Sequence, residues 1–397
     1  MKKIALVLCS VFVLFSCENG DSAIDGSYEL DSSSSSSSKG SESSGDSGNG
    51  GNGESAGQIT AGEWNDLTQW DFWSDLLNSQ DYTTFQANWS FNTSKRIAFQ
   101  VLDKNTSQPL NNVSLSLFKD GEIISEAKTD NLGEANLFID LFDSGKTSSS
   151  VNLDDYDVQI NGEVISQAVS FFNEGVNVLN IQNTTTTANK IEIAFIVDAT
   201  GSMGDELEFL KNDLTNVISR AQEDNANSTI LTSTVFYRDQ GDDYVTRRSD
   251  FTTSISSTVD FISNQSADGG GDFEEAVELA LHEAVNDLQW STNSKTRIAF
   301  LLLDAPPHQT DEVNLSIKKS LINAAKNGVK LIPVTASGID KSTEFLMRYF
   351  AIATNGTYVF ITNDSGIGND HIEPTVGEYE VEFLNNLLVR LINKYAQ

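Results

Sequence analysis

The residues of this chain whose types and spacing could do chemistry are mostly oxygen donors. Asp198, Thr200 and Ser202 follow a nearly continuous apolar segment, so one carboxylate and two hydroxyls share one short loop. Mg²⁺ prefers six oxygen ligands at about 2.0–2.1 Å and gives up water reluctantly, so it suits few carboxylates combined with hydroxyls. In this interpretation Thr200 and Ser202 supply oxygens directly, and Asp198 holds a coordinated water. The alternative is that an isolated Asp-x-Thr-x-Ser only caps a helix.

The composition excludes several other kinds of function. The 397 residues include 57 Asp and Glu against 25 Lys and Arg, and the net charge of −32 leaves no basic surface for nucleic-acid binding. Two cysteines, Cys9 and Cys17, are too few for a disulfide scaffold or a cysteine-ligated zinc site. The three histidines are too scattered along the chain to indicate a zinc centre. Function therefore falls to carboxylates, hydroxyls and backbone groups.

The N-terminus predicts export. Lys2 and Lys3 precede an apolar run over residues 4–15, which is shorter than the roughly 20 residues of a membrane-spanning helix and typical of a signal peptide. The run ends in Leu-Phe-Ser-Cys17, which resembles the lipobox of bacterial lipoproteins. The resemblance implies that residues 1–16 are removed and that Cys17 becomes a lipidated N-terminus; an ordinary secreted protein is the alternative. We therefore expect a location in the bacterial cell envelope, at the outer membrane on either face, the cell surface included, with the lipid as the only membrane contact.

Two segments follow before the first expected domain. Residues 17–58 are rich in Ser and Gly and predict a disordered tether, because they offer almost nothing that can be buried. Residues 59–92 carry four of the five tryptophans and predict a short amphipathic helix within residues 66–78. We expect these rings to cap the core of the domain that follows, with stacking on sugars as the alternative.

Residues 93–183 predict a small all-β domain. Apolar and polar residues alternate in several short segments, and Asn161-Gly162 between two of them is typical of a type I′ hairpin. The stretch resembles the carboxypeptidase-regulatory-like and prealbumin-like β-sandwiches, and this resemblance implies a spacer or stabilising module.

Residues 188–397 alternate between strands and helices, which predicts an open, doubly wound α/β sheet. The expected strands cover residues 191–197, 230–237, 244–248, 297–303, 329–334 and 357–362. The expected helices cover residues 207–218, 257–263, 273–288, 313–327, 344–353 and 379–395. Ligands of such sheets bind beyond the carboxyl ends of the strands, and Asp198 stands at the end of the first strand.

The segment Asp-Ala-Thr-Gly-Ser-Met-Gly from Asp198 to Gly204 closely resembles the start of the metal-ion-dependent adhesion site of von Willebrand factor type A domains, which have a Rossmann-like fold. The resemblance implies that two further loops complete the site. One supplies Asp304, and the other supplies Asp272 after three glycines, where many members have threonine. An acidic Asp272 should tighten metal binding and weaken the pull on an acidic ligand. Asp239, in Tyr-Arg-Asp, is expected to support the ligands without touching the ion. His308, one short loop past Asp304, could line the rim of the site, although a lone loop histidine is usually incidental.

The expected function is metal-dependent recognition of a protein or glycan through its acidic group, with Mg²⁺, or Mn²⁺ or Ca²⁺, as the cation. No catalytic activity is expected. The alternative is a structural or assembly factor of the envelope whose metal only stiffens the loops. A phosphoryl-transfer enzyme is disfavoured because Ala199 stands where such enzymes carry lysine after the aspartate.

Overall fold

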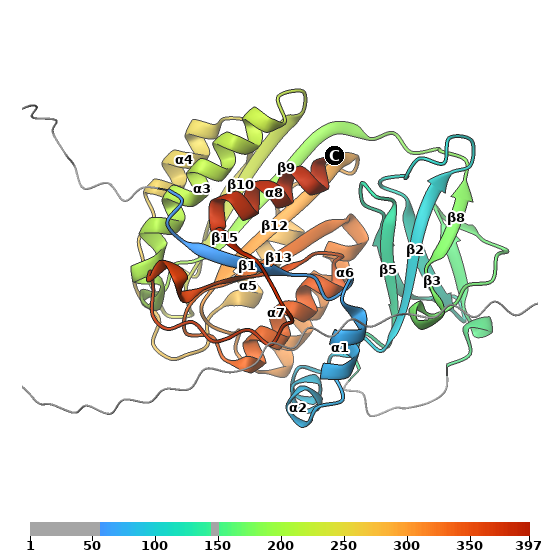
Figure 1. Ribbon diagram of the computed structural model, residues 1–397, viewed down its shortest axis with the longest axis horizontal. Coiled ribbons are helices and arrows are strands. Elements are labelled where there is room, and N and C mark those ends of the chain that lie inside the picture. Colours follow the sequence, from blue (N-terminus) through green and yellow to red (C-terminus); the bar gives the residue numbers. More distant parts are fainter. Residues whose placement is uncertain (1–55, 144–150) are drawn as a thin grey trace, which may run out of the picture. The chain divides into compact units, whose positions relative to one another are not determined.

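The computed structural model describes residues 56–143 and 151–397 (Figure 1). The predicted signal peptide, Cys17 and nearly all of the predicted tether lie outside the described residues. Within the described part of the chain, no helix combines the length and the apolar character that crossing a bilayer requires.

An eight-stranded sheet forms the centre of the C-terminal half, in the order β11-β10-β9-β12-β13-β14-β1-β15. Its strands are β1 (Thr60–Trp64), β9 (Ala188–Asp198), β10 (Thr229–Tyr237), β11 (Thr246–Thr252), β12 (Ser294–Leu303), β13 (Val329–Thr335), β14 (Tyr358–Ile361) and β15 (Val381–Phe383). The five strands β10, β9, β12, β13 and β14 run parallel to one another. Central parallel strands are covered on both faces, which explains why residues 193–197 of β9 and residues 298–303 of β12 are continuously apolar.

Helices cover both faces of this sheet (Figure 1). Side chains of α3 (Gly204–Asp224), α4 (Ile255–Ser263) and α8 (Leu384–Ala396) share one core with Phe195 of β9. Side chains of α5 (Val277–His282), α6 (Asp311–Asn327) and α7 (Lys341–Ala353) share the other core with Ile196, the next residue of that strand. Alternate side chains of one strand therefore pack into the cores on opposite faces of the sheet, and the predicted doubly wound α/β architecture is confirmed.

The order of the parallel strands reverses between β9 and β12. From β9 the chain moves outward to β10, then returns to the other side of β9 to form β12 and continues to β13 and β14. The carboxyl ends of β9 and β12 therefore meet where the connections diverge, which is where open α/β sheets form ligand sites. Asp198 ends β9, and Asp304 directly follows β12.

The helix predicted over residues 273–288 begins later than expected. Its regular part is α5, and a π-helical turn, η4 (Glu283–Asp287), ends it. Before α5, the Glu275 N–H donates to the Pro306 carbonyl oxygen at 2.9 Å, and Glu275 forms a parallel bridge with Pro307. This tertiary pairing holds the backbone at Glu275 in a β-bridge instead of a helical conformation, so local helix propensity is overridden.

The tryptophan-rich segment belongs to the α/β domain. Strand β1 inserts antiparallel between β14 and β15, and two helices follow, α1 (Trp70–Leu76) and α2 (Gln80–Trp89). Trp73 stacks on Phe345 of α7 with ring centroids 5.6 Å apart. Trp64, Trp73 and Trp89 all join the core on that face of the sheet. For these three rings the expectation that they cap the domain that follows is therefore wrong, because β1 carries the segment to a sheet formed almost 300 residues later. Trp70 does contact that domain, since its ring packs edge-on against Phe172 of the sandwich with centroids 5.9 Å apart.

The β-sandwich consists of a three-stranded and a four-stranded sheet around their own apolar core. The first sheet contains β2 (Lys95–Asp103), β5 (Glu134–Ile139) and β8 (Asn177–Ile181). The second contains β3 (Ser114–Lys119), β4 (Glu122–Lys128), β6 (Asp157–Ile160) and β7 (Glu163–Val164). Between β6 and β7, Asn161 and Gly162 both have positive φ, at 49° and 87°, as the predicted type I′ turn requires. Short 3₁₀ turns lie at Leu153–Asp155, Phe172–Glu174, Gly201–Met203 and Asn363–Ser365.

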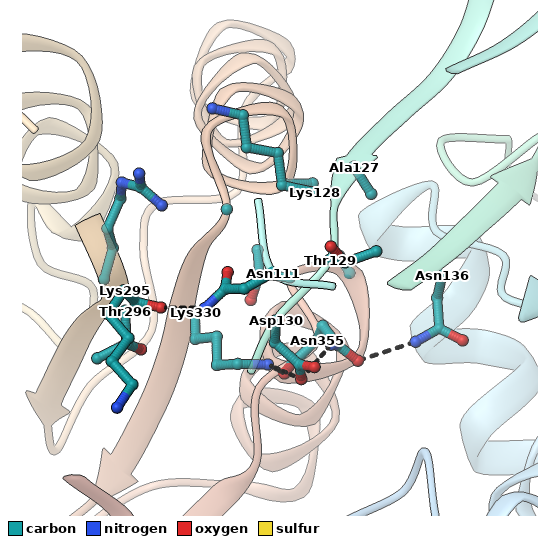
Figure 2. A pocket seen from close by; sticks show the side chains of 15 residues that line it. Asn111, Ala127, Lys128, Thr129, Asp130, Asn136, Lys295, Thr296, Lys330 and Asn355 are labelled. Carbon is teal, nitrogen blue, oxygen red and sulfur yellow. Dashed lines mark hydrogen bonds and ion pairs between the residues drawn. The ribbon is translucent and has the colours of Figure 1, made fainter. Parts of the chain in front are cut away.

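A polar cluster joins the sandwich to the α/β domain (Figure 2). The Lys330 ammonium of β13 donates to Asp130 Oδ2 at 2.9 Å. Asn355, which follows α7, donates to the same carboxylate at 3.0 Å and accepts from Asn136 Nδ2 at 2.9 Å. The Arg297 guanidinium donates to Asn112 Oδ1 at 2.9 Å. Directional bonds of this kind fix orientation more than they add net free energy.

Candidate metal centre

The loop after β9 is held by its own oxygens. Asp198 Oδ1 accepts from the Thr200 N–H at 2.9 Å and from the Thr200 hydroxyl at 2.7 Å. The Thr200 and Ser202 hydroxyl oxygens are 3.2 Å apart. Neither the 3₁₀ turn at 201–203 nor α3 has a side-chain N-cap, so the alternative of a simple helix cap does not describe these residues. Asp198 and Thr200 are fully buried, and Ser202 is exposed, so the loop opens to solvent at Ser202.

Asp304 lies close to this loop, at the switch point where the strand order reverses between β9 and β12. Its side chain is buried, and the Ser202 hydroxyl lies close enough to lower the pKa of its carboxyl. The charge of Asp304 in turn raises the pKa of Asp198. The structure thus brings together Asp198, Thr200, Ser202 and Asp304, four of the five residues that the sequence predicts as ligands.

The acids of this centre are held in surroundings that oppose their charge. Burial, followed by the charge of Asp304, raises the pKa of Asp198 to about 7, although hydrogen bonds from Thr200 act in the opposite direction. Burial is also the main reason that the pKa of Asp304 rises to about 6. Glu275, which the sequence did not single out, has its pKa raised to about 9 by burial and then by Asp198, Asp239 and Asp304. Sites with such shifts are often functional.

Each of these three acids keeps one buried oxygen without a hydrogen-bond partner among the described residues: Asp198 Oδ2, Asp304 Oδ1 and Glu275 Oε2. The Tyr237 hydroxyl, at the end of β10, is buried beside Asp198, and burial followed by the charge of Asp198 raises the pKa of Tyr237 well above its ordinary value. Buried polar atoms in native proteins nearly always have partners, and buried charges are paired or bound to metals. Carboxylate and hydroxyl oxygens are a donor set for a hard divalent cation, so the residues present fit such an ion.

The three-glycine loop closes over the site. The Gly201 N–H donates to the Gly269 carbonyl at 3.2 Å, and the Asp268 N–H donates to the Ala199 carbonyl at 3.1 Å. Gly269 and Gly270 both have positive φ, at 79° and 74°. A Cβ on Gly269 would lie 2.4 Å from the Asp242 carboxylate, and one on Gly270 would lie 3.0 Å from Glu275 Oε1. Glycine at both positions therefore lets the loop adopt these backbone angles against the Asp242 and Glu275 side chains.

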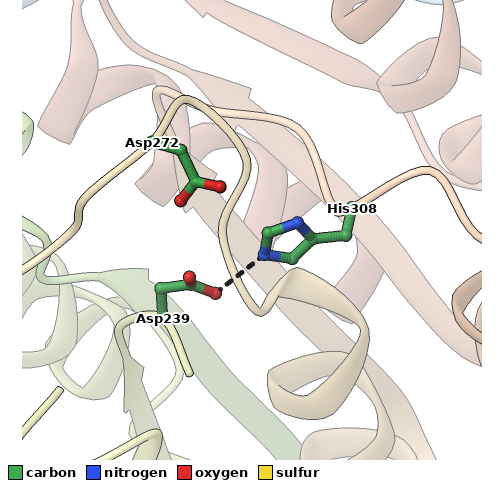
Figure 3. A group of neighbouring side chains, drawn as sticks. All are labelled: Asp239, Asp272 and His308. Atoms are coloured by element: carbon green, nitrogen blue, oxygen red, sulfur yellow. Dashed lines mark hydrogen bonds and ion pairs between the residues drawn. The ribbon is translucent and has the colours of Figure 1, made fainter. Parts of the chain in front are cut away.

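Asp272 lies in a different group from the one expected. The structure places it beside Asp239 and His308, and ligand atoms of the three side chains all lie within 4.8 Å of one another (Figure 3). Asp239 Oδ1 is 3.0 Å from His308 Nε2. The expectation that His308 is incidental is therefore corrected. Sequence spacing could not show this, because Asp239 and His308 are 69 residues apart and meet only when β10 and β12 end at the same edge.

Arg238 is a further residue whose part the sequence did not reveal. It is buried at 4% exposure beside the acids, yet its guanidinium donates to the Ala199 carbonyl at 3.1 Å and to the Ser266 carbonyl at 2.8 Å. It also lies over the Tyr244 ring, 4.6 Å from its centroid. Arg238 thus ties the Asp198 loop to the segment before the glycines. The only signal was its place in Tyr237-Arg238-Asp239 at a strand end.

Comparison with known proteins agrees with this architecture. Residues 192–358 match the family model of the von Willebrand factor A domain. The chain is 32% identical over 118 residues to a putative ariadne-like RING finger protein of Acanthamoeba polyphaga mimivirus, covering 30% of this chain and 11% of the relative. It is 27% identical over 172 residues to the alpha-protein kinase vwkA of Dictyostelium discoideum, covering 43% and 27%. The chain thus spans about a quarter or less of the length of these curated relatives.

Among solved structures, BatB of Bacteroides thetaiotaomicron matches with 13% identity and a TM-score of 0.36, over 52% of this chain and 98% of that one. An aerotolerance-related membrane protein of Bacteroides fragilis matches with 13% identity and a TM-score of 0.33, over 51% and 99%. The family match coincides with the parallel sheet and with both loops that carry Asp198 and Asp304. Residues 192–358 of this chain are a von Willebrand factor A domain.

Proposed function

We propose that Asp198, Thr200, Ser202 and Asp304 hold a divalent cation, Mg²⁺ or else Mn²⁺ or Ca²⁺, and that the loaded domain binds a protein or glycan through an acidic group. The observation that carries this proposal is the pair of buried acids at the switch point, each with an unpartnered oxygen. A von Willebrand factor A domain is generally an interaction module, which supports binding rather than catalysis.

The surrounding residues suit a preformed socket. Thr200 holds Asp198 in one orientation through two hydrogen bonds, and Arg238 holds the loop by donating to the Ala199 carbonyl. A bound cation supplies positive charge and open coordination positions. Ser202 is the exposed member of the set, so an incoming carboxylate approaches from its side. Neutral hydroxyl ligands leave the cation incompletely neutralised, which keeps its attraction for an acidic group.

The remaining parts of the chain suit presentation of this domain. We propose that Cys17 is lipidated in the cell envelope, that residues 17–58 act as a tether, and that the sandwich is a spacer. The kinase among the relatives matches over 27% of its own length, so its activity is not carried over to this chain.

The competing proposal is a structural or assembly factor whose cation only stiffens the loops. Under both proposals Asp198→Ala abolishes the Mg²⁺-induced rise in melting temperature. Under the binding proposal alone, the same substitution also removes chelator-sensitive capture of surface partners while the metal-free fold stays intact. Asp260→Ala, at an exposed position of α4, is the matched control and should change neither property. Partner capture that persists in Asp198→Ala or in chelator would favour the structural role.

A further inference from the structure

We propose a second divalent-cation site formed by Asp239, Asp272 and His308, which takes a nitrogen-binding transition metal such as Zn²⁺ in preference to Mg²⁺. One carboxylate oxygen from each aspartate and one ring nitrogen of His308 lie within 4.8 Å of one another (Figure 3). The site shares no ligand with the Asp198 group. It therefore stands whether or not that group holds a cation.

The geometry needs little change to accept an ion. Zinc binds imidazole nitrogen at about 2.0–2.1 Å and carboxylate oxygen at about 2.0–2.2 Å, so adjacent ligand atoms around it lie roughly 3 Å apart. Asp239 Oδ1 and His308 Nε2 already have that separation, at 3.0 Å. An imidazole ligand favours zinc and its neighbours in the transition series, whereas Mg²⁺ prefers oxygen alone.

Two of the three side chains are held in place, and the third can close the site. Asp239 is 8% exposed at the end of β10, and its backbone N–H donates to Asp242 Oδ2 at 3.1 Å. His308 follows two prolines on the segment that pairs with Glu275. Asp272 is exposed and follows three glycines, so its carboxylate can adjust toward an ion.

A second observation points to the same place. Glu278, on α5, is 3% exposed, and its Oε2 has no hydrogen-bond partner among the described residues. Its pKa is raised first by burial and also by Asp239, whereas His308 lowers it, so its carboxyl lies within electrostatic range of both. A divalent cation bound by Asp239, Asp272 and His308 would give this buried carboxyl an oppositely charged neighbour.

The test uses untagged protein with Co²⁺ as the probe, because paramagnetic Co²⁺ shifts the N–H resonance of a coordinated imidazole far outside the ordinary proton range. The chain has only three histidines, so each assignment is tractable. We expect one shifted imidazole resonance in the wild type. It should persist in Asp198→Ala, vanish in His308→Ala and disappear on addition of one equivalent of Zn²⁺.

His282→Ala is the matched control and should keep the signal. Asp272→Asn is a second test in case His308→Ala fails to fold, because Asp272 is exposed and its substitution should leave the fold intact. It should weaken Co²⁺ binding by about tenfold or more. The proposal is overturned if no shifted resonance forms, if the signal survives in His308→Ala, or if Asp198→Ala removes it. Unchanged Co²⁺ affinity in Asp272→Asn would also overturn it.

Discussion

At the scale of single residues, the centre is defined by acids whose environment opposes ionisation. Asp198 and Asp304 are buried at the ends of neighbouring strands, and each retains an oxygen without a partner among the described residues. Their pKa values, about 7 and about 6, lie well above the 3.9 of an unfolded aspartate. A carboxylate stabilised by an ion pair would have a lowered pKa, so these raised values are the opposite case. A bound cation would stabilise the ionised form of both acids.

The raised pKa values predict a pH dependence for the metal-free protein. Between about pH 4 and pH 7 the folded state holds protons on these acids that the unfolded state has released, so their contribution to the free energy of unfolding falls as pH rises through that interval. We expect the melting temperature in chelator to fall from pH 5 to pH 8, and added Mg²⁺ to reduce the fall. Asp198→Asn should flatten the slope, which separates this effect from the general repulsion of a highly acidic chain. An equal slope in wild type and Asp198→Asn would contradict the account.

At the scale of elements, the alternation of strands and helices after residue 188 could be predicted because buried parallel strands are apolar throughout and surface helices show a 3.6-residue period. The Asp198 loop and Asp304 could be placed because the ends of parallel strands share one edge. The start of α5 could not be predicted from the sequence, because it depends on the tertiary pairing of Glu275 with Pro306 and Pro307. The grouping of Asp272 with Asp239 and His308 could not be predicted either, because it too depends on tertiary contacts.

The glycine loop supports a prediction at this scale. In Gly270→Ala a side chain must adopt φ of 74° and its Cβ would lie 3.0 Å from Glu275 Oε1, so the loop should shift and Mg²⁺ affinity should fall by about tenfold or more. Gly241→Ala is a matched control, because its φ is 102° but no atom lies within 4 Å of the added Cβ. Both variants should lose about 1–2 kcal/mol of stability. Calorimetric Mg²⁺ titration should separate them, and equal affinities would argue against a role for this loop in the site.

At the scale of the whole molecule, a segment far from the α/β domain in sequence completes it. Arg348 of α7 binds the Asp66 carboxylate with both ends of its guanidinium, at 2.6 Å and 2.9 Å, and both side chains are almost fully buried. Strand β1 extends the sheet next to them. The sequence could show that residues 59–92 carry aromatic anchors but not which domain they join, because the partners lie more than 250 residues away.

Breaking this buried pair should therefore be costly. Arg348→Ala leaves Asp66 charged and buried, and we expect a loss of about 3–5 kcal/mol in the free energy of unfolding. Arg390→Ala removes solvent-exposed pairs with Glu382 and with Glu63 of β1, and it should cost at most about 1 kcal/mol. Chemical denaturation followed by tryptophan fluorescence measures both. Similar losses in the two variants would show that the segment is not held through Arg348.

We propose that oxygens from the β9 loop and the end of β12 surround one divalent cation. Anomalous diffraction from crystals soaked in Mn²⁺ tests this most directly, because the scattering locates the metal itself. We expect a peak in contact with Ser202 and Asp304 and next to Asp198, and no such peak in crystals of Asp198→Ala. Well-diffracting soaked crystals without a peak between those side chains would contradict it.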